Sequence, residues 1–374
     1  MAFKVGVLGG GQLGRMLLSP AMDFGLDISI LDPDPDAPCK MFCQQFYVGN
    51  LNSYDDVYSF GHKMDIITIE IENVNVDALI QLQKEGKKII PDPQHLKLIQ
   101  DKSLQKQFYL ENNIPTANFF VATNSSELKS KITGFPFIQK LRKGGYDGRG
   151  VQKIKSEADF PLLFDQPSIA EELIDFSMEI SVLVARKESG EVVVYDPVEM
   201  KFNSEKNIVE FLIVPARISS EISEKAISTA FDLVQKMQFV GLLAVELFVD
   251  KYENVLVNEI APRPHNSGHH TIEACITSQY DQLLRIIADY PLGASTLLSP
   301  AVTINILGED GYEGNVKYDG LEKVLHMDQS YIHLYGKKLT KPYRKMGHIT
   351  TLHSEIETAI TISENIINTL KAKA

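Results

Sequence analysis

Residues 144–150 read Gly144-Gly145-Tyr146-Asp147-Gly148-Arg149-Gly150, and this stretch decides how the fold is interpreted. Four glycines in seven residues allow a tight backbone path whose N–H groups can approach phosphate oxygens closely. The flanking stretches 135–141 and 151–154 are strand-like, so we expect a hairpin tip. A Walker A loop would instead open a helix with Gly-Lys-Ser or Gly-Lys-Thr, and neither follows. The pattern predicts a lid over a nucleotide held between sheets.

Two glutamates occupy neighbouring apolar runs, Glu246 within 244–249 and Glu259 within 255–260, and residues 250–254 have the composition of a turn. If residue 250 faces residue 255, the ladder places Glu246 opposite Glu259. Paired carboxylates among apolar neighbours are costly without a cation. Mg²⁺ is the expected occupant, because it takes one or two protein carboxylates and completes its octahedron with phosphates and water. The alternative is a solvent-exposed pair on an edge hairpin.

Composition indicates an ordinary globular protein with room for two or three domains: 374 residues, 44% hydrophobic and 23% charged. A formal net charge of −12 disfavours nucleic acid and anionic membranes as partners. No segment approaches the ~20 apolar residues of a membrane helix. The three cysteines are too few and too scattered for a disulfide framework or a zinc site. We therefore expect a cytoplasmic protein.

Strand and helix patterns alternate from residue 3 to 90, which predicts a doubly wound parallel sheet. Pro91-Asp92-Pro93 then marks a boundary. The pattern to about residue 290 suits two α+β lobes, and short strands follow. The expected architecture is α/β and α+β, with an N-terminal domain over 1–93, two lobes over 94–290 and a small β-rich domain over 291–374.

A second glycine-rich stretch, Gly9 to Gly14, follows the first strand and matches the dinucleotide fingerprint G-x-G-x-x-G, with Asp32 ending the second strand. Alone it would indicate a NAD-dependent oxidoreductase. A helix N-terminus presents free N–H groups to any phosphorylated ligand, however. Because the chain has a separate candidate nucleotide site, we expect this loop to bind a sugar phosphate or to have lost its ligand.

Polar residues continue directly from Glu259 and must lie beside the proposed metal. Arg263 can fork onto a phosphate or carboxylate, and His265, Asn266 and Ser267 offer hydrogen bonds. His265 and His269 have the spacing of helical zinc ligands, but the general-base glutamate of H-E-x-x-H is absent, so zinc is disfavoured. A basic cluster near the C-terminus is either a solvated loop or an anchor for a substrate phosphate, and comprises Lys337, Lys338, Lys341, Arg344 and Lys345.

Together these motifs resemble the ATP-grasp superfamily and, within it, the N5-carboxyaminoimidazole ribonucleotide synthetase family. The resemblance spans nearly the whole chain: GGGQLGRML at 9–17, EIENV at 70–74, KGGYDGRG at 143–150, NEIAPRPHNSGH at 258–269 and YRKMGH at 343–348. It implies ATP, Mg²⁺ (or Mn²⁺), bicarbonate and 5-aminoimidazole ribonucleotide as reactants, in a homodimer of purine biosynthesis.

The resemblance also implies site residues. Those implied for ATP are Lys102, Lys140, Gly144, Gly145, Tyr146, Asp147, Gly148, Arg149, Gly150, Glu171, Glu172, Leu173, Ile174, Glu179, Asn203, Asn258 and Glu259, with Glu246 and Glu259 on the metal. Those implied for the ribonucleotide are Gln12, Leu13, Glu70, Tyr146, Asp147, Arg263, His265, Asn266, Ser267, Lys337, Arg344 and Lys345. Asn203 stands where many members carry a His. Strict alternation would turn Asn258 away from Glu259, so either the strand is irregular there or its role is weaker.

The implied mechanism begins with attack of bicarbonate on the γ-phosphorus of ATP, while Lys140, Arg263 and Mg²⁺ offset the developing charge. The carboxyphosphate formed, or CO₂ released from it, is captured by the 5-amino group, with Arg263, His265 and Asp147 as the catalytic candidates. The nearest rival is a formate-dependent glycinamide ribonucleotide transformylase of the same superfamily. The Pro262-to-His269 sequence favours the carboxylating enzyme.

Overall fold

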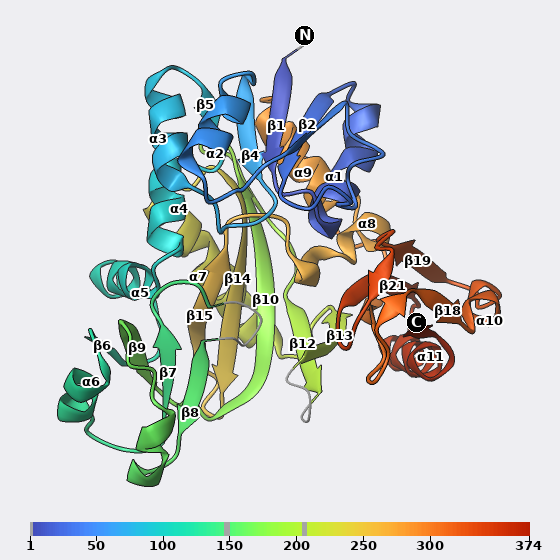
Figure 1. Ribbon diagram of the computed structural model, residues 1–374. Helices are drawn as coiled ribbons and strands as arrows, with labels where there is room; N and C mark the ends of the chain where they lie inside the picture. The colour runs from blue at the N-terminus through green and yellow to red at the C-terminus, as the bar shows by residue number, and fades with distance from the viewer. Residues whose placement is uncertain (1–2, 146–149, 204–207) are drawn as a thin grey trace.

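The N-terminal part is a five-stranded parallel sheet, as the alternating pattern predicted. A computed structural model describes residues 3–145, 150–203 and 208–374. The strand order is β3-β2-β1-β4-β5, so the chain reverses direction across the sheet between β1 and β4 (Figure 1). The elements are β1 (Lys4–Leu8), α1 (Gln12–Asp23), β2 (Asp27–Asp32), β3 (Gln45–Val48), α2 (Tyr54–Gly61), β4 (Ile66–Ile69), α3 (Val76–Lys84) and β5 (Lys88–Ile89).

Two helices lead from this sheet into a small four-stranded lobe. Each begins at an aspartate whose carboxylate accepts a backbone N–H, Asp92 for α4 and Asp101 for α5. In the lobe, β7 and β8 pair as an antiparallel hairpin with Lys140 opposite Val151, which confirms the predicted hairpin around the glycine-rich stretch. The elements are α4 (Pro93–Ile99), α5 (Lys102–Glu111), β6 (Phe119–Ala122), α6 (Ser125–Lys131), β7 (Phe137–Leu141), β8 (Val151–Ile154), η1 (Glu157–Leu162) and β9 (Ser168–Glu172).

The largest sheet runs through the centre of the molecule in the order β15-β14-β10-β12-β13-β16-β21-β19, with β11 beside β10. It contains β10 (Phe176–Arg186), β11 (Val192–Val194), β12 (Val198–Asn203), β13 (Ile208–Val214), β14 (Gly241–Asp250), β15 (Val255–Ala261), β16 (Ala301–Leu307), β19 (Ser330–Leu334) and β21 (Lys345–Leu352). β13 pairs with β16. The C-terminal strands β16, β21 and β19 therefore extend the central sheet, whereas the short strands of the same part form two separate two-stranded sheets.

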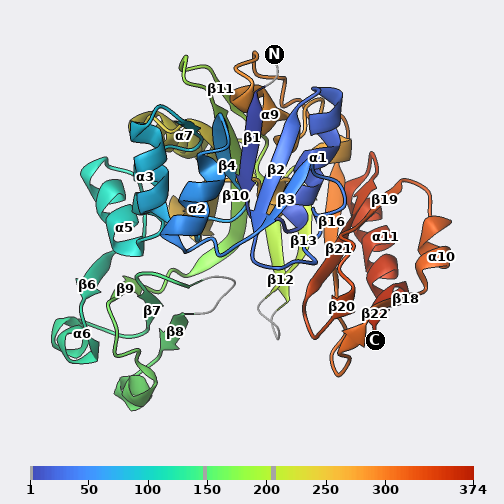
Figure 2. The same cartoon turned by 45° about the horizontal axis from the view of Figure 1, so that its top comes forward.

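The remaining elements pack around this sheet, with α7 on one of its faces. They are α7 (Ser220–Met237), η2 (Asn266–Gly268), α8 (Thr271–Ala274), α9 (Gln279–Ile287), β17 (Gly314–Asn315), β18 (Lys317–Asp319), α10 (Leu321–Leu325), β20 (Leu339–Thr340), α11 (Ile356–Thr369) and β22 (Lys371–Lys373). α9 shares a hydrophobic core with α1, through residues such as Leu284 and Leu17. The N-terminal sheet is thereby fixed onto the central part (Figure 2).

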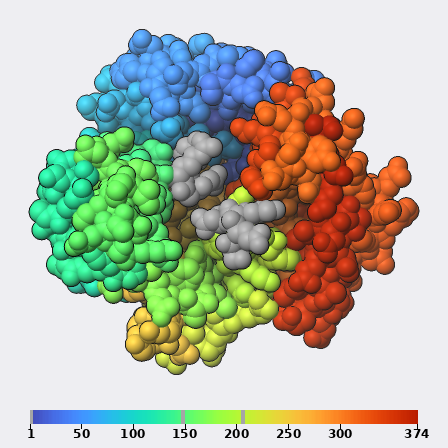
Figure 3. Space-filling model, turned by 60° about the horizontal axis from the view of Figure 1, so that its bottom comes forward, coloured from blue at the N-terminus to red at the C-terminus, as the bar shows by residue number. Residues whose placement is uncertain are grey.

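Alternation along the central strands separates an apolar face from a polar one. Ile180, Val182 and Val245 pack in one core with Leu233 and Val234 of α7. Side chains at the intervening positions point to the opposite face. In Figure 3 the N-terminal part (blue), the small lobe (green) and the C-terminal part (red) surround a hollow on one side of the molecule. Among the described residues, no helix is both long and apolar enough to cross a membrane.

Candidate active site

Glu246 of β14 and Glu259 of β15 are directly paired across the strands, as the sequence predicted. The expected turn was wrong by one residue, because Val249 rather than Asp250 pairs with Val255. A β-bulge compensates: Leu247 pairs with Val257, so Asn258 is the extra residue on its strand. The irregularity that alternation required is therefore present, and it lets consecutive residues Asn258 and Glu259 serve one site.

Three carboxylates share the polar face. Glu246 pairs with Ser181 of β10, and Glu179 lies two residues from Ser181, so all three point to the same side. Burial and the nearby Glu259 and Glu179 raise the pKa of Glu246 to about 8. Burial also raises the pKa of Glu179 to about 7. The Lys102 ammonium instead lowers the pKa of Glu259 to about 2. Ionising all three carboxylates would therefore require a further cation, and the oxygen donors suit Mg²⁺.

Two lysines face these carboxylates, from different parts of the chain. Lys102, at the start of α5, places Nζ 2.6 Å from Glu259 Oε2. Lys140, on β7 of the small lobe, donates to Asn258 Oδ1 at 2.9 Å. Its Nζ also lies 2.8 Å from Glu171 Oε2. The predicted phosphate-binding lysines and the predicted metal ligands therefore meet between the two lobes.

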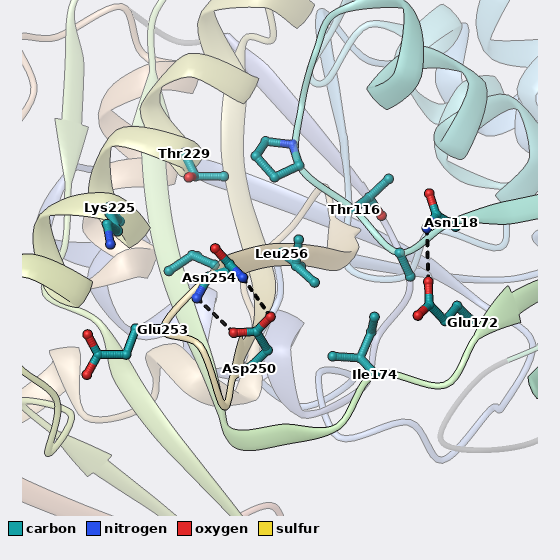
Figure 4. Close-up of a pocket in the computed structure, with 13 residues that line it drawn as sticks. Thr116, Asn118, Glu172, Ile174, Lys225, Thr229, Asp250, Glu253, Asn254 and Leu256 are labelled. Carbon is teal, nitrogen blue, oxygen red and sulfur yellow. Dashed lines mark hydrogen bonds between the residues drawn. The ribbon is translucent and has the colours of Figure 1, made fainter. Parts of the chain in front are cut away.

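The expected adenine segment, residues 171–174, divides into a buried and an open part. Glu171 is buried between Lys140 and Lys106. Glu172 and Ile174 line an open cavity of about 490 Å³ at the outer edge of β15, where Asn118 donates to Glu172 Oε2 at 2.9 Å (Figure 4). Leu173, between them, is partly buried. Leu256 of β15 also lines that cavity, whereas Glu246 and Glu259 do not.

The segment after Glu259 turns back over the carboxylates. His265 places Nε2 3.3 Å from Glu246 Oε1, and its Nδ1 accepts the backbone N–H of Ser267. That acceptor role leaves the proton of a neutral ring on Nε2, facing Glu246. Burial and Arg263 lower the pKa of His265 to about 3, so the ring is neutral at physiological pH. The buried Gln279 fixes the backbone of His265 by bonding both its N–H and its carbonyl.

Arg263 forms a two-nitrogen contact with Glu72, with Nε and Nη2 donating to the two carboxylate oxygens. Arg263 also lowers the pKa of Glu72, against the effect of burial. Ser267 hydrogen-bonds Ser181 of β10 at 2.8 Å, and Asn266 begins the short η2 helix beside it. The four predicted residues from 263 to 267 therefore lie together, beside Glu246.

Sequence reasoning missed Glu72, Ser181 and Lys106. Glu72 lies inside the EIENV motif at 70–74, from which only Glu70 was selected. Its carboxylate was recognisable as a partner for Arg263 only once β4 and the 263–267 segment were placed together. Ser181 and Lys106 carried no local signal, because Ser181 is a single polar residue in an apolar strand and Lys106 is one of several polar residues of a helix.

The first glycine-rich loop is filled by carboxylates of the chain itself. Gly10 N–H donates to Asp32 Oδ2 at 2.6 Å, and Leu13 N–H donates to Glu70 Oε1 at 3.1 Å. A Cβ on Gly11 would lie 2.5 Å from Glu70 Oε1, so glycine is needed for this close approach. Burial raises the pKa of Glu70. A dinucleotide pyrophosphate would have to displace both acids, which argues against the dehydrogenase alternative.

The C-terminal basic residues reach the same loop. Lys337 Nζ donates to Gln12 Oε1 at 3.0 Å and to the Lys345 carbonyl at 2.7 Å. Burial, with Arg344 and Lys345 nearby, lowers the pKa of Lys337 to about 8. Arg344 donates to the Leu339 carbonyl at 2.8 Å. Lys338 instead pairs with Asp36 at the surface, and 74% of its side chain is exposed.

Other expected residues lie at the margins. Asn203, at the end of β12, donates to Glu210 Oε1 at 3.3 Å. Gly144 and Gly150 have φ of +78° and +74°, which glycine adopts readily, and Gly145 lies beside them. Tyr146, Asp147, Gly148 and Arg149 lie outside the described residues. Across 3–145, 150–203 and 208–374, no group of three or more His, Cys, Asp or Glu side chains is arranged to hold a metal, so the magnesium prediction rests on the two paired carboxylates alone.

Comparison with known proteins identifies the class. The ATP-grasp domain model matches residues 107–280, the ribonucleotide synthetase preATP-grasp domain matches 1–100, and the phosphoribosylaminoimidazole carboxylase C-terminal domain matches 301–361. The structure of N5-carboxyaminoimidazole ribonucleotide synthetase from Thermotoga maritima is similar, with a TM-score of 0.92 and 39% identity over 100% of this chain and 99% of that one. The chain therefore has the ATP-grasp fold.

A narrower family follows from full-length similarity. N5-carboxyaminoimidazole ribonucleotide synthase from Staphylococcus haemolyticus is 36% identical over 363 residues, covering 94% of this chain and 93% of that protein. The chain belongs to this family. It spans 65% of the length of another relative, phosphoribosylaminoimidazole carboxylase from Ogataea methanolica. A structure from Aspergillus clavatus, in complex with ADP and 5-aminoimidazole ribonucleotide, matches with a TM-score of 0.89 at 33% identity over 98% of each chain.

Proposed function

We propose that the chain catalyses the ATP-dependent carboxylation of 5-aminoimidazole ribonucleotide by bicarbonate, giving N5-carboxyaminoimidazole ribonucleotide, ADP and phosphate. One observation carries this proposal: His265 Nε2 lies 3.3 Å from Glu246 Oε1. The segment 263–267, which is expected to bind the ribonucleotide, therefore lies directly beside Glu246, which is expected to bind the metal. Family membership, and the relative seen with ADP and the ribonucleotide, support the same reaction.

Within this proposal, Glu246 and Glu259 hold Mg²⁺, or Mn²⁺ in its place, and Lys102 and Lys140 bind the ATP phosphates. The bound metal would neutralise charge on the transferred phosphoryl group. Arg263, oriented by Glu72, faces the charge that develops as bicarbonate oxygen bonds to the γ-phosphorus and the bond to ADP breaks.

The second step uses the neutral His265. The carboxyphosphate, or CO₂ from it, forms a bond with the 5-amino nitrogen, phosphate leaves, and the amine proton passes to that phosphate. His265 and Asp147 orient the amine, and residues 144–150 exclude the water that would hydrolyse carboxyphosphate. Gln12, Leu13, Glu70, Asn266, Ser267, Lys337, Arg344 and Lys345 hold the ribonucleotide.

The remaining assignments belong to the same proposal. The nucleotide contacts include residues 171–174, Glu179, Asn203 and Asn258. The domain limits are 1–93, 94–290 and 291–374. The enzyme acts as a cytoplasmic homodimer, without nucleic acid or membrane partners.

The test follows ADP release with ATP, Mg²⁺ and 5-aminoimidazole ribonucleotide, with and without added bicarbonate. A parallel reaction contains formate and glycinamide ribonucleotide. Turnover that requires the imidazole substrate and bicarbonate is the expected result. Activity only with the second pair would transfer the assignment to the transformylase, and ADP release from neither mixture, in folded protein, would refute both.

Nucleotide choice gives a further prediction. We expect Mg²⁺–ATP to raise the melting temperature, because a ligand that binds only the folded state stabilises it by mass action. NADH should leave it unchanged, since Asp32 and Glu70 already bind the N–H groups of the first glycine-rich loop. Differential scanning fluorimetry at matched ligand concentrations decides between them. Protection by NADH alone would restore the dehydrogenase alternative.

Lys337 should make ribonucleotide binding sensitive to pH. Its pKa of about 8 in the free protein rises when an anionic phosphate binds, so the charged form binds more tightly. Affinity is therefore expected to fall as pH rises through about 8, by roughly a few-fold between pH 7 and 9. Calorimetric titration of the ribonucleotide measures this. Lys337→Met should abolish the pH dependence and Lys338→Met, the exposed neighbour, should retain it; the reverse result would contradict the assignment.

A further inference from the structure

Lys106 is a buried lysine to which the mechanism above assigns no role. It lies on α5, its residue is 2% exposed, and its Nζ lies 2.8 Å from Glu171 Oε1. It also donates to Thr116 Oγ1 at 2.6 Å, and Thr116 in turn donates to the Val257 carbonyl at 2.7 Å. Burial lowers the pKa of Lys106, and the Glu171 carboxylate opposes this effect. A buried ammonium is costly unless it is paired and hydrogen-bonded, as it is here.

Glu171 connects Lys106 to the phosphate end of the site. Its second oxygen, Oε2, lies 2.8 Å from Lys140 Nζ, and Lys140 continues to Asn258 Oδ1 at 2.9 Å. These contacts join α5, β9, β7 and β15. One carboxylate between two ammoniums leaves a net single positive charge. Lys140 can therefore be held in place without being neutralised.

We propose that Lys106 is a positioning residue for the ATP site: by binding one oxygen of Glu171, it makes that carboxylate a fixed bridge that aims Lys140 at the nucleotide phosphates. The inference rests on the proposed function, since it requires that Lys140 bind ATP. Without Lys106, Glu171 and Lys140 would form a neutral pair that competes with the phosphates. Without the Glu171 charge, the two ammoniums would repel each other and Lys140 would lose its orientation.

Three variants test this in the full-length protein, with dissociation constants for ATP and for adenosine measured by calorimetry. Lys106→Met is expected to weaken ATP binding about tenfold and to leave adenosine binding unchanged, because adenosine lacks phosphates. Glu171→Gln should also weaken ATP binding, although it adds net positive charge; a simple charge effect would strengthen it. Thr116→Val removes the other partner of Lys106, together with the bond from Thr116 to the Val257 carbonyl, but leaves Glu171 in place; it is the matched control and should retain wild-type affinity.

A double-mutant cycle makes the test specific. If Lys106 acts through Lys140, Lys106→Met should change ATP affinity less than about twofold in a Lys140→Met background. Additive effects, or equal losses for ATP and adenosine, would show a structural role and overturn the proposal. If Lys106→Met does not fold, Glu171→Gln decides alone: tighter ATP binding would refute the proposal. Failure of the wild type to bind ATP would instead refute the proposed function, and the inference with it.

Discussion

Glu259→Gln is expected to lower the rate of ADP formation by about a thousandfold or more while leaving the fold intact. The substitution removes one of two proposed metal ligands and the partner of Lys102, but keeps the shape of the side chain. Metal stabilisation of a transferred phosphoryl group is worth several kcal/mol, and each 1.36 kcal/mol is about tenfold in rate. The measurement is ADP release at saturating ATP, Mg²⁺ and ribonucleotide.

Glu253→Gln is the matched control, because Glu253 lies exposed in the turn of the same hairpin. It should retain normal turnover. Circular dichroism and thermal melting of both variants check that the overall fold is retained. Near-normal activity of Glu259→Gln would remove the two-carboxylate argument and, with it, the reason for placing a metal between β14 and β15.

Arg263→Met is expected to reduce kcat by roughly 10²–10³-fold, the range for removing one preorganised donor at a developing charge. The guanidinium is held by Glu72, so it requires little reorganisation during the reaction. Because ATP binding rests on other residues, KM for ATP should change much less than kcat. Steady-state kinetics with varied ATP separates the two constants.

The chain offers a matched control for the loss of such an ion pair. Arg217 donates Nε and Nη2 to the two oxygens of Glu199, at 2.9 and 2.6 Å. Glu199 pairs with Ile180, so it lies on the apolar face of the sheet, away from Glu179 and Glu246. Arg217→Met should lose stability without losing activity. Equal losses of kcat in both variants would show that Arg263 acts through the fold rather than at the reaction.

Periodicity was sufficient for the N-terminal sheet and for the Glu246–Glu259 pairing, because both depend on local patterns. Residue counting misplaced the turn, however, and the pairing was correct only because the bulge at Asn258 restored the register. A bulge depends on how a strand meets its neighbours, which one strand cannot reveal. The continuation of the central sheet into β16 was missed for the same reason.

At the site, the sequence mainly failed to predict contacts between residues that are far apart in the chain. Arg263 and Glu72 are 191 residues apart, and Lys102 and Glu259 are 157 apart. Motifs identified three of these four side chains and missed Glu72, and the spacing of motifs contains no information about which side chains touch. Glu171 shows the limit: its motif indicated the adenine segment, whereas its carboxylate lies between two lysines.

The continuity of the central sheet has a mechanical consequence. The strands from β15 to β19 form one continuous hydrogen-bonded sheet, so Glu259 on one edge strand and Lys345 near the other edge belong to the same rigid element. The small lobe is instead connected to the rest of the chain by two short segments, residues 112–118 before β6 and residues 173–175 after β9. The spacing between Glu259 and Lys345 is therefore fixed by the sheet itself, and Lys140 reaches Asn258 from a lobe that is joined to the sheet by only two short segments.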